Sequence, residues 1–420
     1  MSVPDVKLIL GEKVADKFVV KKKIGEGSCG QVYLVTDTRN DNTLAMKVEP
    51  RMKLKDEEIL KMEIYVLKKL QTSKHVCRFV QSGLNAQFRQ GRVLAPRQRT
   101  FSYVIMTLLG QELSECRRLC PKRKMSASST IRIAIQAVTV NPPRRQAIHN
   151  SQAVEDMHNT GFIHRDIKPT NLALGHKVWE GRKRRVEGRP FQQKHVVYMF
   201  DFGLARQIMI PDKAGKMTLR EPRKKVSFRG TVRYCSLNVH QAKEQGRHDD
   251  LWSVLPPSSS TLSRCVLHTL VELVTGTLPW KGAGRKEAER LKASTSEKAL
   301  LKGCPPPLAF LYKTLQSCTY TTLPPYTDIK KSFADEIKKQ KVKMTAPFEW
   351  ETSGGPAGKK AGDKSIAKDG GDNDTSKDVN EDAVSATTEA SNTDSVNECD
   401  VENTLENIAD IGNSSRDAPK

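Results

Sequence analysis

The sequence predicts an α+β fold with two lobes, a small β-rich N-terminal lobe that carries one helix and a larger, mainly helical C-terminal lobe. Segments rich in β-branched and aromatic residues are concentrated before residue 107, and the last of them predicts a strand at 101–106. One amphipathic helix lies among these segments, whereas the chain afterwards is mainly helical. After Trp350 no aromatic residue occurs, so this polar stretch cannot bury a core and should be disordered. The expected divisions are a leader at 1–15, a folded region at 16–350 with lobes at about 16–106 and 107–350, and an acidic tail at 351–420.

Composition and charge limit the kinds of function. The chain has 420 residues, which is enough for two sizeable cores, and a formal net charge of +22. Because the tail is net acidic, the first 350 residues are more basic still and should attract polyanions. Nucleic acid is one candidate, but no recognised nucleic-acid motif is present, and acidic or phosphorylated protein or nucleotide phosphate fits at least as well.

The sequence carries no membrane or secretion signal. No apolar run approaches the ~20 residues of a membrane span, and the N-terminus lacks the apolar core of a signal peptide. We therefore expect a cytoplasmic or nuclear protein. The nine cysteines include no C-x-x-C pair, which indicates reduced thiols rather than a zinc site or a disulfide framework.

The first two expected strands, 18–24 and 31–37, are joined by a glycine-rich turn. Its glycines, Gly25, Gly27 and Gly30, follow the pattern G-x-G-x-x-G. Because a strand and not a helix follows the turn, the pattern argues against a dinucleotide site and favours a hairpin that covers phosphate groups. Taken alone, the motif is equally consistent with a glycine-rich hairpin that binds nothing.

A lysine on the third expected strand, 43–48, has a candidate partner on the expected helix, 56–70. Apolar residues of this helix recur at helical spacing, and Glu63 lies on the apolar face. A carboxylate that is turned inward needs a charged partner, for which Lys47 is the natural candidate. The alternative is that Glu63 lies at the margin of the apolar stripe, in water.

Two further motifs bring together groups that can act on a phosphate. Asp166 can accept the proton of a hydroxyl, and Asn171, five residues later, offers an oxygen that suits Mg²⁺. Asp201 begins an Asp-Phe-Gly turn behind a short apolar strand at 196–200 and offers a second oxygen ligand. Either motif alone could be an ordinary polar loop or turn.

These motifs stand in the order that is typical of eukaryotic protein kinases, and the chain resembles that family over roughly residues 17–350. In place of the usual Ala-Pro-Glu, the chain has Gly-Thr-Val-Arg-Tyr-Cys-Ser-Leu-Asn at 230–238, which is similar to the casein kinase 1 group. The blocks most similar to the tau-tubulin kinases within that group are 61–70, 75–79, 228–234 and 246–253.

The resemblance implies a serine/threonine protein kinase that uses ATP and Mg²⁺. In this interpretation Asp166 is the catalytic base, Lys168 contacts the transferring phosphate, and Asn171 and Asp201 hold Mg²⁺. Asp250 is expected to brace the catalytic loop. The implied ATP-binding residues are Gly25, Gly27 and Gly30 over the phosphates, Lys47 with Glu63 at the α- and β-phosphates, Ile24 and Val32 near adenine, Met106 as gatekeeper and Leu109 in the hinge.

The resemblance also implies a preference for serine or threonine near acidic or phosphorylated side chains. A basic run beside the expected activation segment agrees, because it could hold a phosphate; the alternative is a solvated basic loop. The candidate residues are Arg220, Lys224, Arg229 and Arg233. Thr231 could instead be a phosphorylation site. In the tail, Thr375 and Ser385 follow acidic residues at the required spacing, which predicts autophosphorylation there.

Four segments interrupt the family-like sequence, near 89–100, 139–152, 176–194 and 256–268. Two of them fall between strands, where added loop length costs little. The other two split stretches that read as single helices when joined, 130–137 with 154–158 and 250–255 with 269–274. We favour retained introns over lineage-specific insertions as the origin of some of them. Because such insertions could strain the fold, a pseudokinase scaffold that binds acidic partners is the alternative function.

Overall fold

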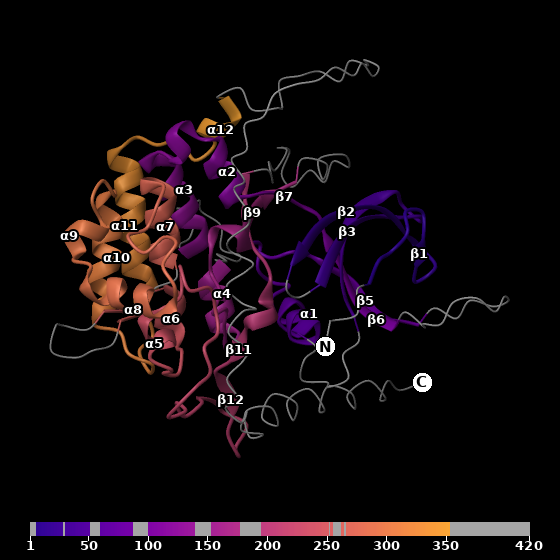
Figure 1. The fold of residues 1–420 in the computed structure, drawn as a ribbon, viewed down its shortest axis with the longest axis horizontal. Helices are drawn as coiled ribbons and strands as arrows, with labels where there is room; N and C mark the ends of the chain where they lie inside the picture. Colours follow the sequence, from indigo (N-terminus) through magenta and orange to yellow (C-terminus); the bar gives the residue numbers. More distant parts are fainter. Residues whose placement is uncertain are drawn as a thin grey trace.

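The computed structural model describes residues 6–27, 30–50, 59–86, 100–138, 153–176, 195–251, 253–254, 262–263 and 266–352. In Figure 1 the N-terminal strands and one helix form one side of the molecule, and the helices of the later chain form the other. The expected α+β architecture with two lobes is therefore confirmed. Thr375, Ser385 and nearly all of the interrupting segments lie outside the described residues.

The N-terminal lobe is built on an antiparallel sheet with the strand order β1-β2-β3-β4-β6-β5. The strands expected at 18–24, 31–37, 43–48 and 101–106 are all present. Side chains alternate between the two faces of β4 and β6, so that each face is buried in a different cluster. The bounds are β1 Lys13–Val14, β2 Phe18–Gly27, β3 Gly30–Asp37, β4 Asn42–Pro50, β5 Phe79–Ala86 and β6 Thr100–Thr107.

The helix of this lobe, α1 (Ile59–Lys69), packs on the inner face of the sheet. Glu49 of β4 accepts hydrogen bonds from the backbone N–H groups of Ile59 and Leu60, both at 3.0 Å, and so satisfies two donors that the first helical turn leaves free. Val66, Leu67 and Leu70 are buried, as the periodicity predicted. Ile59 and Met62 of the same stripe are half-buried, and Leu60, which lies outside the predicted stripe, is buried. The same buried cluster continues into the helical lobe, so the lobes share one core.

The C-terminal lobe contains most of the helices and several short strands. The helices are α2 Leu113–Leu119, α3 Ala127–Val138, α4 Ala153–Asn159, α5 Leu237–His240, α6 Arg247–Leu251, α7 Val266–Thr275, α8 Arg285–Ser294, α9 Glu297–Leu300, α10 Pro306–Gln316, α11 Tyr326–Lys339 and α12 Glu349–Thr352, with 3-10 turns η2 Pro121–Arg123, η3 Pro169–Asn171 and η6 Phe202–Leu204. The strands are β7 Leu109–Glu112, β8 Phe162–Ile163, β9 Leu172–Gly175, β10 Val197–Met199, β11 Arg206–Gln207, β12 Met209–Pro211, β13 Met217–Leu219, β14 Ser253–Val254 and β15 Leu262–Ser263. Within the described ranges, every helix is too short or too polar to cross a lipid bilayer.

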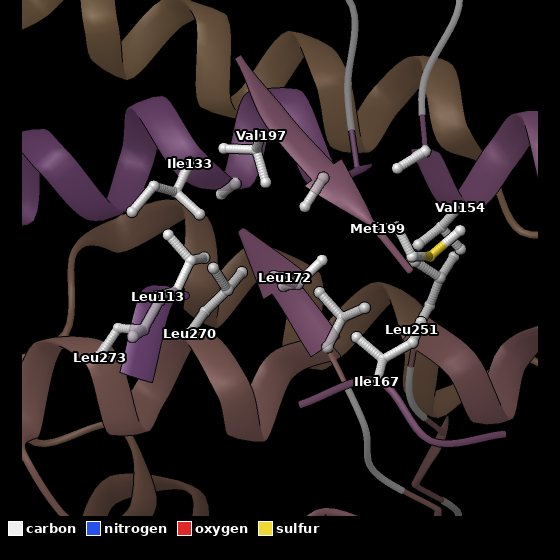
Figure 2. Packing of buried hydrophobic residues seen from close by; sticks show 14 of the residues in the cluster. Leu113, Ile133, Val154, Ile167, Leu172, Val197, Met199, Leu251, Leu270 and Leu273 are labelled. Atoms are coloured by element: carbon white, nitrogen blue, oxygen red, sulfur yellow. The ribbon is translucent and has the colours of Figure 1, made fainter. Parts of the chain in front are cut away.

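The core of this lobe is packed around the paired strands β9 and β10. Leu172 of β9 and Val197 and Met199 of β10 belong to one buried cluster with Ile133 of α3 and Leu270 of α7 (Figure 2). Because η3 leads directly into β9 and Asp201 follows β10, and because Leu172 lies opposite Met199 in the antiparallel pair, this packing fixes the polar groups at one end of the two strands.

The two interrupted helices differ in the structure from a continuous helix. α3 and α4 are separate elements, and residues 139–152 between them lie outside the described residues. The stretches 250–255 and 269–274, which read as one helix only when joined, are separated in the structure: α6 ends at Leu251, and β14 pairs with β15 before α7 begins. The prolines at 256 and 257 explain the difference, since proline disfavours a helical residue before it and lacks the N–H that a helix needs.

Candidate active site

The loop around Asp166 is held from beneath by Asp250, which is fully buried on α6. Its carboxylate accepts the backbone N–H groups of His164 at 2.6 Å and Arg165 at 2.8 Å. His158 of α4 contacts the same carboxylate through Nε2 at 2.9 Å. Burial alone would raise the pKa of Asp250, but the hydrogen bond with His158 and the nearby imidazoles outweigh it and lower this pKa. The bracing role expected for Asp250 therefore has a geometric basis.

The loop is locally strained at Arg165, where the backbone adopts a left-handed conformation with φ of 70°. The side chain compensates by donating from Nε to the carbonyl of Leu204 at 2.6 Å. Burial, followed by the charges of Arg206, Arg229 and Arg223, lowers the pKa of Arg165 to about 9. A surplus of positive charge is thus concentrated under the loop.

Asp166, Lys168 and Asn171 lie in direct contact. Lys168 Nζ is 2.9 Å from Asp166 Oδ2, and Asn171 Nδ2 donates to the carbonyl of Asp166 at 2.9 Å. Thr231 completes the group: its hydroxyl donates to Asp166 Oδ1 at 2.7 Å, and Lys168 donates to that hydroxyl at 2.9 Å. The arrangement places a carboxylate, an ammonium and a hydroxyl around one point.

Thr231 is a functional candidate for which the sequence had suggested only phosphorylation, as an alternative that the resemblance disfavours. Its backbone N–H also donates to Asp166 Oδ1, at 3.0 Å. The two residues are 65 positions apart, and no spacing rule connects them. The only sequence signal is the neighbouring Gly230, whose φ of 117° brings its Cα so near the carbonyl of Arg165 that a Cβ would lie 2.7 Å from the oxygen.

A second cluster joins both lobes through Lys47. Its Nζ lies 2.6 Å from Glu63 Oε2 on α1 and 3.0 Å from Asp201 Oδ1 after β10. The expected pairing of Lys47 with Glu63 is therefore confirmed. Asp201 has a left-handed backbone with φ of 63°. Burial opposes ionisation of Asp201, but the charge of Lys47 outweighs it and lowers the pKa of this carboxyl.

Asn171 and Asp201 are brought together through the backbone, because the N–H of Phe200 donates to the carbonyl of Asn171 at 3.1 Å. One carboxylate and one amide oxygen suit Mg²⁺, which takes few protein ligands and completes its shell with substrate phosphates and water. Among the described side chains, no group of three or more His, Cys, Asp and Glu residues could hold a metal ion without such help.

The other residues expected at ATP lie on strands next to Lys47. Val32 of β3 is directly opposite Lys47, and Gly25 and Gly27 of β2 pair with Val32 and Gly30. At Gly30, where φ is 120°, a Cβ would lie 2.1 Å from the carbonyl oxygen of Val48, so only glycine fits.

The remaining ATP candidates differ in their burial and in the part of the fold to which they belong. Met106 of β6 is buried and pairs with Ala45 of β4, whereas Ile24 is largely exposed. Leu109 begins β7 and pairs with Gly175 of β9, so it belongs to the strands of the helical lobe. The expected residues therefore extend from the hairpin to the junction of the lobes.

The four basic substrate candidates differ in exposure and in their partners. Lys224 and Arg229 are exposed, but Arg233 lies 3.8 Å from the buried Glu272, and Arg220 is half-buried. Burial, assisted by the charge of Arg223, lowers the pKa of Arg220.

Comparison with known proteins gives consistent matches. The protein kinase domain family matches residues 18–318. A probable serine/threonine-protein kinase of Dictyostelium discoideum is 30% identical over 342 residues, which cover 81% of this chain and 58% of that protein. A Caenorhabditis elegans protein named as a serine/threonine-protein kinase is 31% identical over 348 residues, covering 82% and 84%. A C. elegans protein named as a casein kinase I is 32% identical over 274 residues, covering 64% of each. The chain thus spans less than two thirds of the first and third of these relatives.

Proposed function

Because this chain belongs to the protein kinase domain family, we propose that it is an active serine/threonine protein kinase that transfers the γ-phosphate of ATP to protein substrates. The observation that carries the proposal is the contact of Asp166 with both Lys168 and Thr231. The Lys47 cluster supports it from the other lobe. Every catalytic position that the family pattern requires is filled.

In the proposed mechanism, Asp166 accepts the proton of the substrate hydroxyl as the hydroxyl oxygen attacks the γ-phosphorus. The bond between the γ-phosphorus and the oxygen that bridges it to the β-phosphate breaks, and ADP leaves. Lys168, 2.9 Å from that carboxylate, stabilises the charge on the transferring group. Lys47, held by Glu63, binds the α- and β-phosphates. Asn171 and Asp201 would hold Mg²⁺, which when bound neutralises phosphate charge.

We further propose that the substrates carry acidic or phosphorylated side chains near the acceptor. The exposed Lys224 and Arg229 support this preference, as does the excess of basic residues in the first 350. A cavity of about 300 Å³ is lined by Arg223, Lys224 and Lys243, although Glu244 also lines it. Assignment to the casein kinase 1 group and its tau-tubulin branch belongs to the same proposal. So does autophosphorylation of Thr375 and Ser385.

The test is phosphate transfer from ATP to an arrayed peptide library by the wild type and by Asp166→Asn. Loss of the base should lower kcat by about 10² to 10⁴. Peptides with acidic residues close to Ser or Thr should react fastest. Asp335→Asn, at an exposed position on α11, is the matched control and should react as the wild type does.

Two results would overturn parts of the proposal. If the wild type transfers no phosphate but retains acidic peptides, the scaffold alternative is correct. If it transfers phosphate equally to neutral and acidic peptides, the kinase assignment stands and the acidic preference fails.

A further inference from the structure

We propose that Lys292 is a positioning residue for the protein substrate, because it holds from beneath the segment that follows Thr231. We call residues 231–235 the acceptor segment. The inference rests on the proposed kinase function, since it concerns the protein substrate of that reaction. Lys292 lies on α8 and was not marked by any sequence motif.

The acceptor segment begins at the catalytic group. Thr231 contacts Asp166 through its hydroxyl and its N–H. A substrate hydroxyl must approach the same carboxylate, so the residues that follow Thr231 are the next part of the protein that substrate backbone can meet. The position of this segment therefore decides how the acceptor residue is presented.

Lys292 is completely buried and uses its ammonium group on three acceptors. Nζ donates to the carbonyl of Val232 at 2.5 Å and to the carbonyl of Cys235 at 2.9 Å, and lies 3.2 Å from His240 Nε2. An ammonium has three N–H bonds, and this geometry provides an acceptor for each. Nζ also lies 5.6 Å from the centre of the Trp280 ring, a distance that suits a cation–π contact.

The other carbonyls of the turn are bound from the same side. Trp280 Nε1 donates to the carbonyl of Arg233 at 2.8 Å, and His268 Nδ1 of α7 lies 3.4 Å from the carbonyl of Tyr234. Four consecutive carbonyls, 232 to 235, thus meet side chains of the helical lobe. Lys292 binds the first and the last of them, so it limits the freedom of the whole turn.

His240 of α5 is chemically suited to accept from Lys292. Burial, followed by the charges of Lys292 and Arg285, lowers the pKa of His240 to about 3. The imidazole is therefore neutral near pH 7, and a neutral ring can offer a lone pair at Nε2. α5 is itself capped by Ser236, whose hydroxyl accepts the N–H of Val239 at 3.2 Å. The lysine thus links α8, α5 and the acceptor segment.

This position separates protein-substrate binding from ATP binding. The contacts of Lys292 described above are with the acceptor segment, α5 and Trp280, whereas the ATP candidates lie on the sheet, on α1, in β7 and after β10. Loss of the lysine should therefore change the Michaelis constant for peptide and leave that for ATP nearly unchanged. A defect of folding alone would lower kcat by reducing the active fraction and would move neither constant.

The experiment compares Lys292→Met with Lys286→Met, an exposed lysine on the same helix. Methionine keeps an unbranched, apolar side chain that is one atom shorter than that of lysine, and it removes all three N–H donors. We expect the KM for peptide to rise about tenfold in Lys292→Met, with the KM for ATP within about twofold, because one fully buried charged anchor is lost. Amide hydrogen exchange of residues 231–236 should become faster, and Lys286→Met should match the wild type in all three measurements.

Two further variants keep the inference testable if Lys292→Met does not fold. Lys292→Arg retains the charge, but its planar guanidinium cannot direct three donors as an ammonium does. The KM of this variant for peptide should therefore be higher than that of the wild type. Trp280→Phe retains a ring and removes only the donor to the carbonyl of Arg233, so it should raise the peptide KM and the exchange rate by smaller factors.

The outcomes distinguish this inference from the proposed function. An unchanged peptide KM, or unchanged exchange of residues 231–236, in Lys292→Met would show that the lysine does not position the segment. If the wild type phosphorylates no peptide, the kinase proposal itself fails, while the exchange rates still show whether Lys292 holds residues 231–235.

Discussion

Among single residues, Glu244 shows how one carboxylate stabilises a cluster of arginines. Arg223 Nε lies 2.6 Å from one carboxylate oxygen of Glu244, and Arg206 Nε lies 3.3 Å from the other. Burial opposes ionisation of Glu244, but the hydrogen bond from Arg223 and the charge of Arg206 outweigh it and lower its pKa. Without this carboxylate, the repulsion that already lowers the pKa of Arg165 would be unopposed.

Glu244→Gln should therefore destabilise the protein by about 3 kcal/mol near pH 7, because it removes one partner of a buried ion pair. A carboxyl with a lowered folded-state pKa contributes stability above its unfolded pKa of about 4.3, and this contribution is lost as pH falls through the folded pKa. The difference between wild type and variant should thus be constant at neutral pH and shrink below about pH 4. Urea unfolding at several pH values measures it.

The control for this prediction is Glu287→Gln, which affects an exposed pair with Arg290 on α8. It should change the free energy of unfolding very little, because exposed ion pairs are screened by water. A Glu244→Gln effect that is equally large at neutral and acidic pH would show that the loss is one of packing and not of charge.

Individual site residues differed in how far the sequence could predict them. Lys47 and Glu63 could be paired from local patterns, because an inward carboxylate on an apolar helix face requires a cation. Thr231 and Lys292 could not be found in this way. Their partners, Asp166 and the carbonyl of Val232, are defined only by the tertiary fold, and backbone carbonyls carry no sequence signature.

Among elements, the short helix α12 is docked on α3 through a buried arginine. Arg132 donates from Nη2 to the carbonyls of Met344 at 3.0 Å and Ala346 at 2.6 Å, and its guanidinium lies 3.8 Å from the centre of the Phe348 ring. Glu349 accepts the N–H of Ser126 at 2.7 Å, just before α3 begins. Figure 1 shows α12 beside α2, near the N-terminal end of α3.

Arg132→Met should loosen this attachment at a cost of about 3 kcal/mol, since two charge-assisted hydrogen bonds and a cation–π contact are lost. Limited proteolysis should then cut within 344–352 at least about tenfold faster than in the wild type, because local opening exposes the segment. Arg290→Met, on the exposed face of α8, is the matched control. Unchanged cutting within 344–352 would contradict the prediction.

The predictability of an element depended on how local its determinants are. Four strands of the sheet, β2, β3, β4 and β6, and the helix α1 follow patterns of residue type and spacing that the sequence displays directly. β1 and β5 were not predicted. The hairpin of β14 and β15 was missed because a strand pair of two residues each has no measurable period. The interruption between 250–255 and 269–274 could be predicted from the two prolines at 256 and 257, and α6 and α7 are indeed separate helices.

For the whole molecule, the distribution of charge is the dominant feature. The sequence after residue 352 is acidic, and the chain before it carries the excess of basic residues. Opposite charges on one chain attract, and at short range they compete with any acidic substrate for the same basic side chains. This partition was fully readable from the sequence, because it depends on composition and not on the fold.

Truncation after Thr352, which retains α12, should therefore lower the KM for an acidic peptide by about three- to fivefold at about 50 mM salt. The decrease in KM that the truncation causes should disappear near roughly 500 mM salt, because the electrostatic screening length of the solution then falls below about 5 Å. A neutral peptide should show little change under either condition. If truncation lowers the KM for the acidic peptide equally at all salt concentrations, the effect of the tail is not electrostatic.

The left-handed backbone at Asp201 has a consequence for protein engineering. A non-glycine residue with positive φ costs of order 1–3 kcal/mol, and asparagine or glycine would relax part of that cost. A laboratory selection for heat resistance alone would therefore enrich replacements at position 201, and each of them would remove the carboxylate that lies 3.0 Å from Lys47 Nζ. Directed evolution of this chain must score turnover together with melting temperature, because at this position the two properties favour different residues.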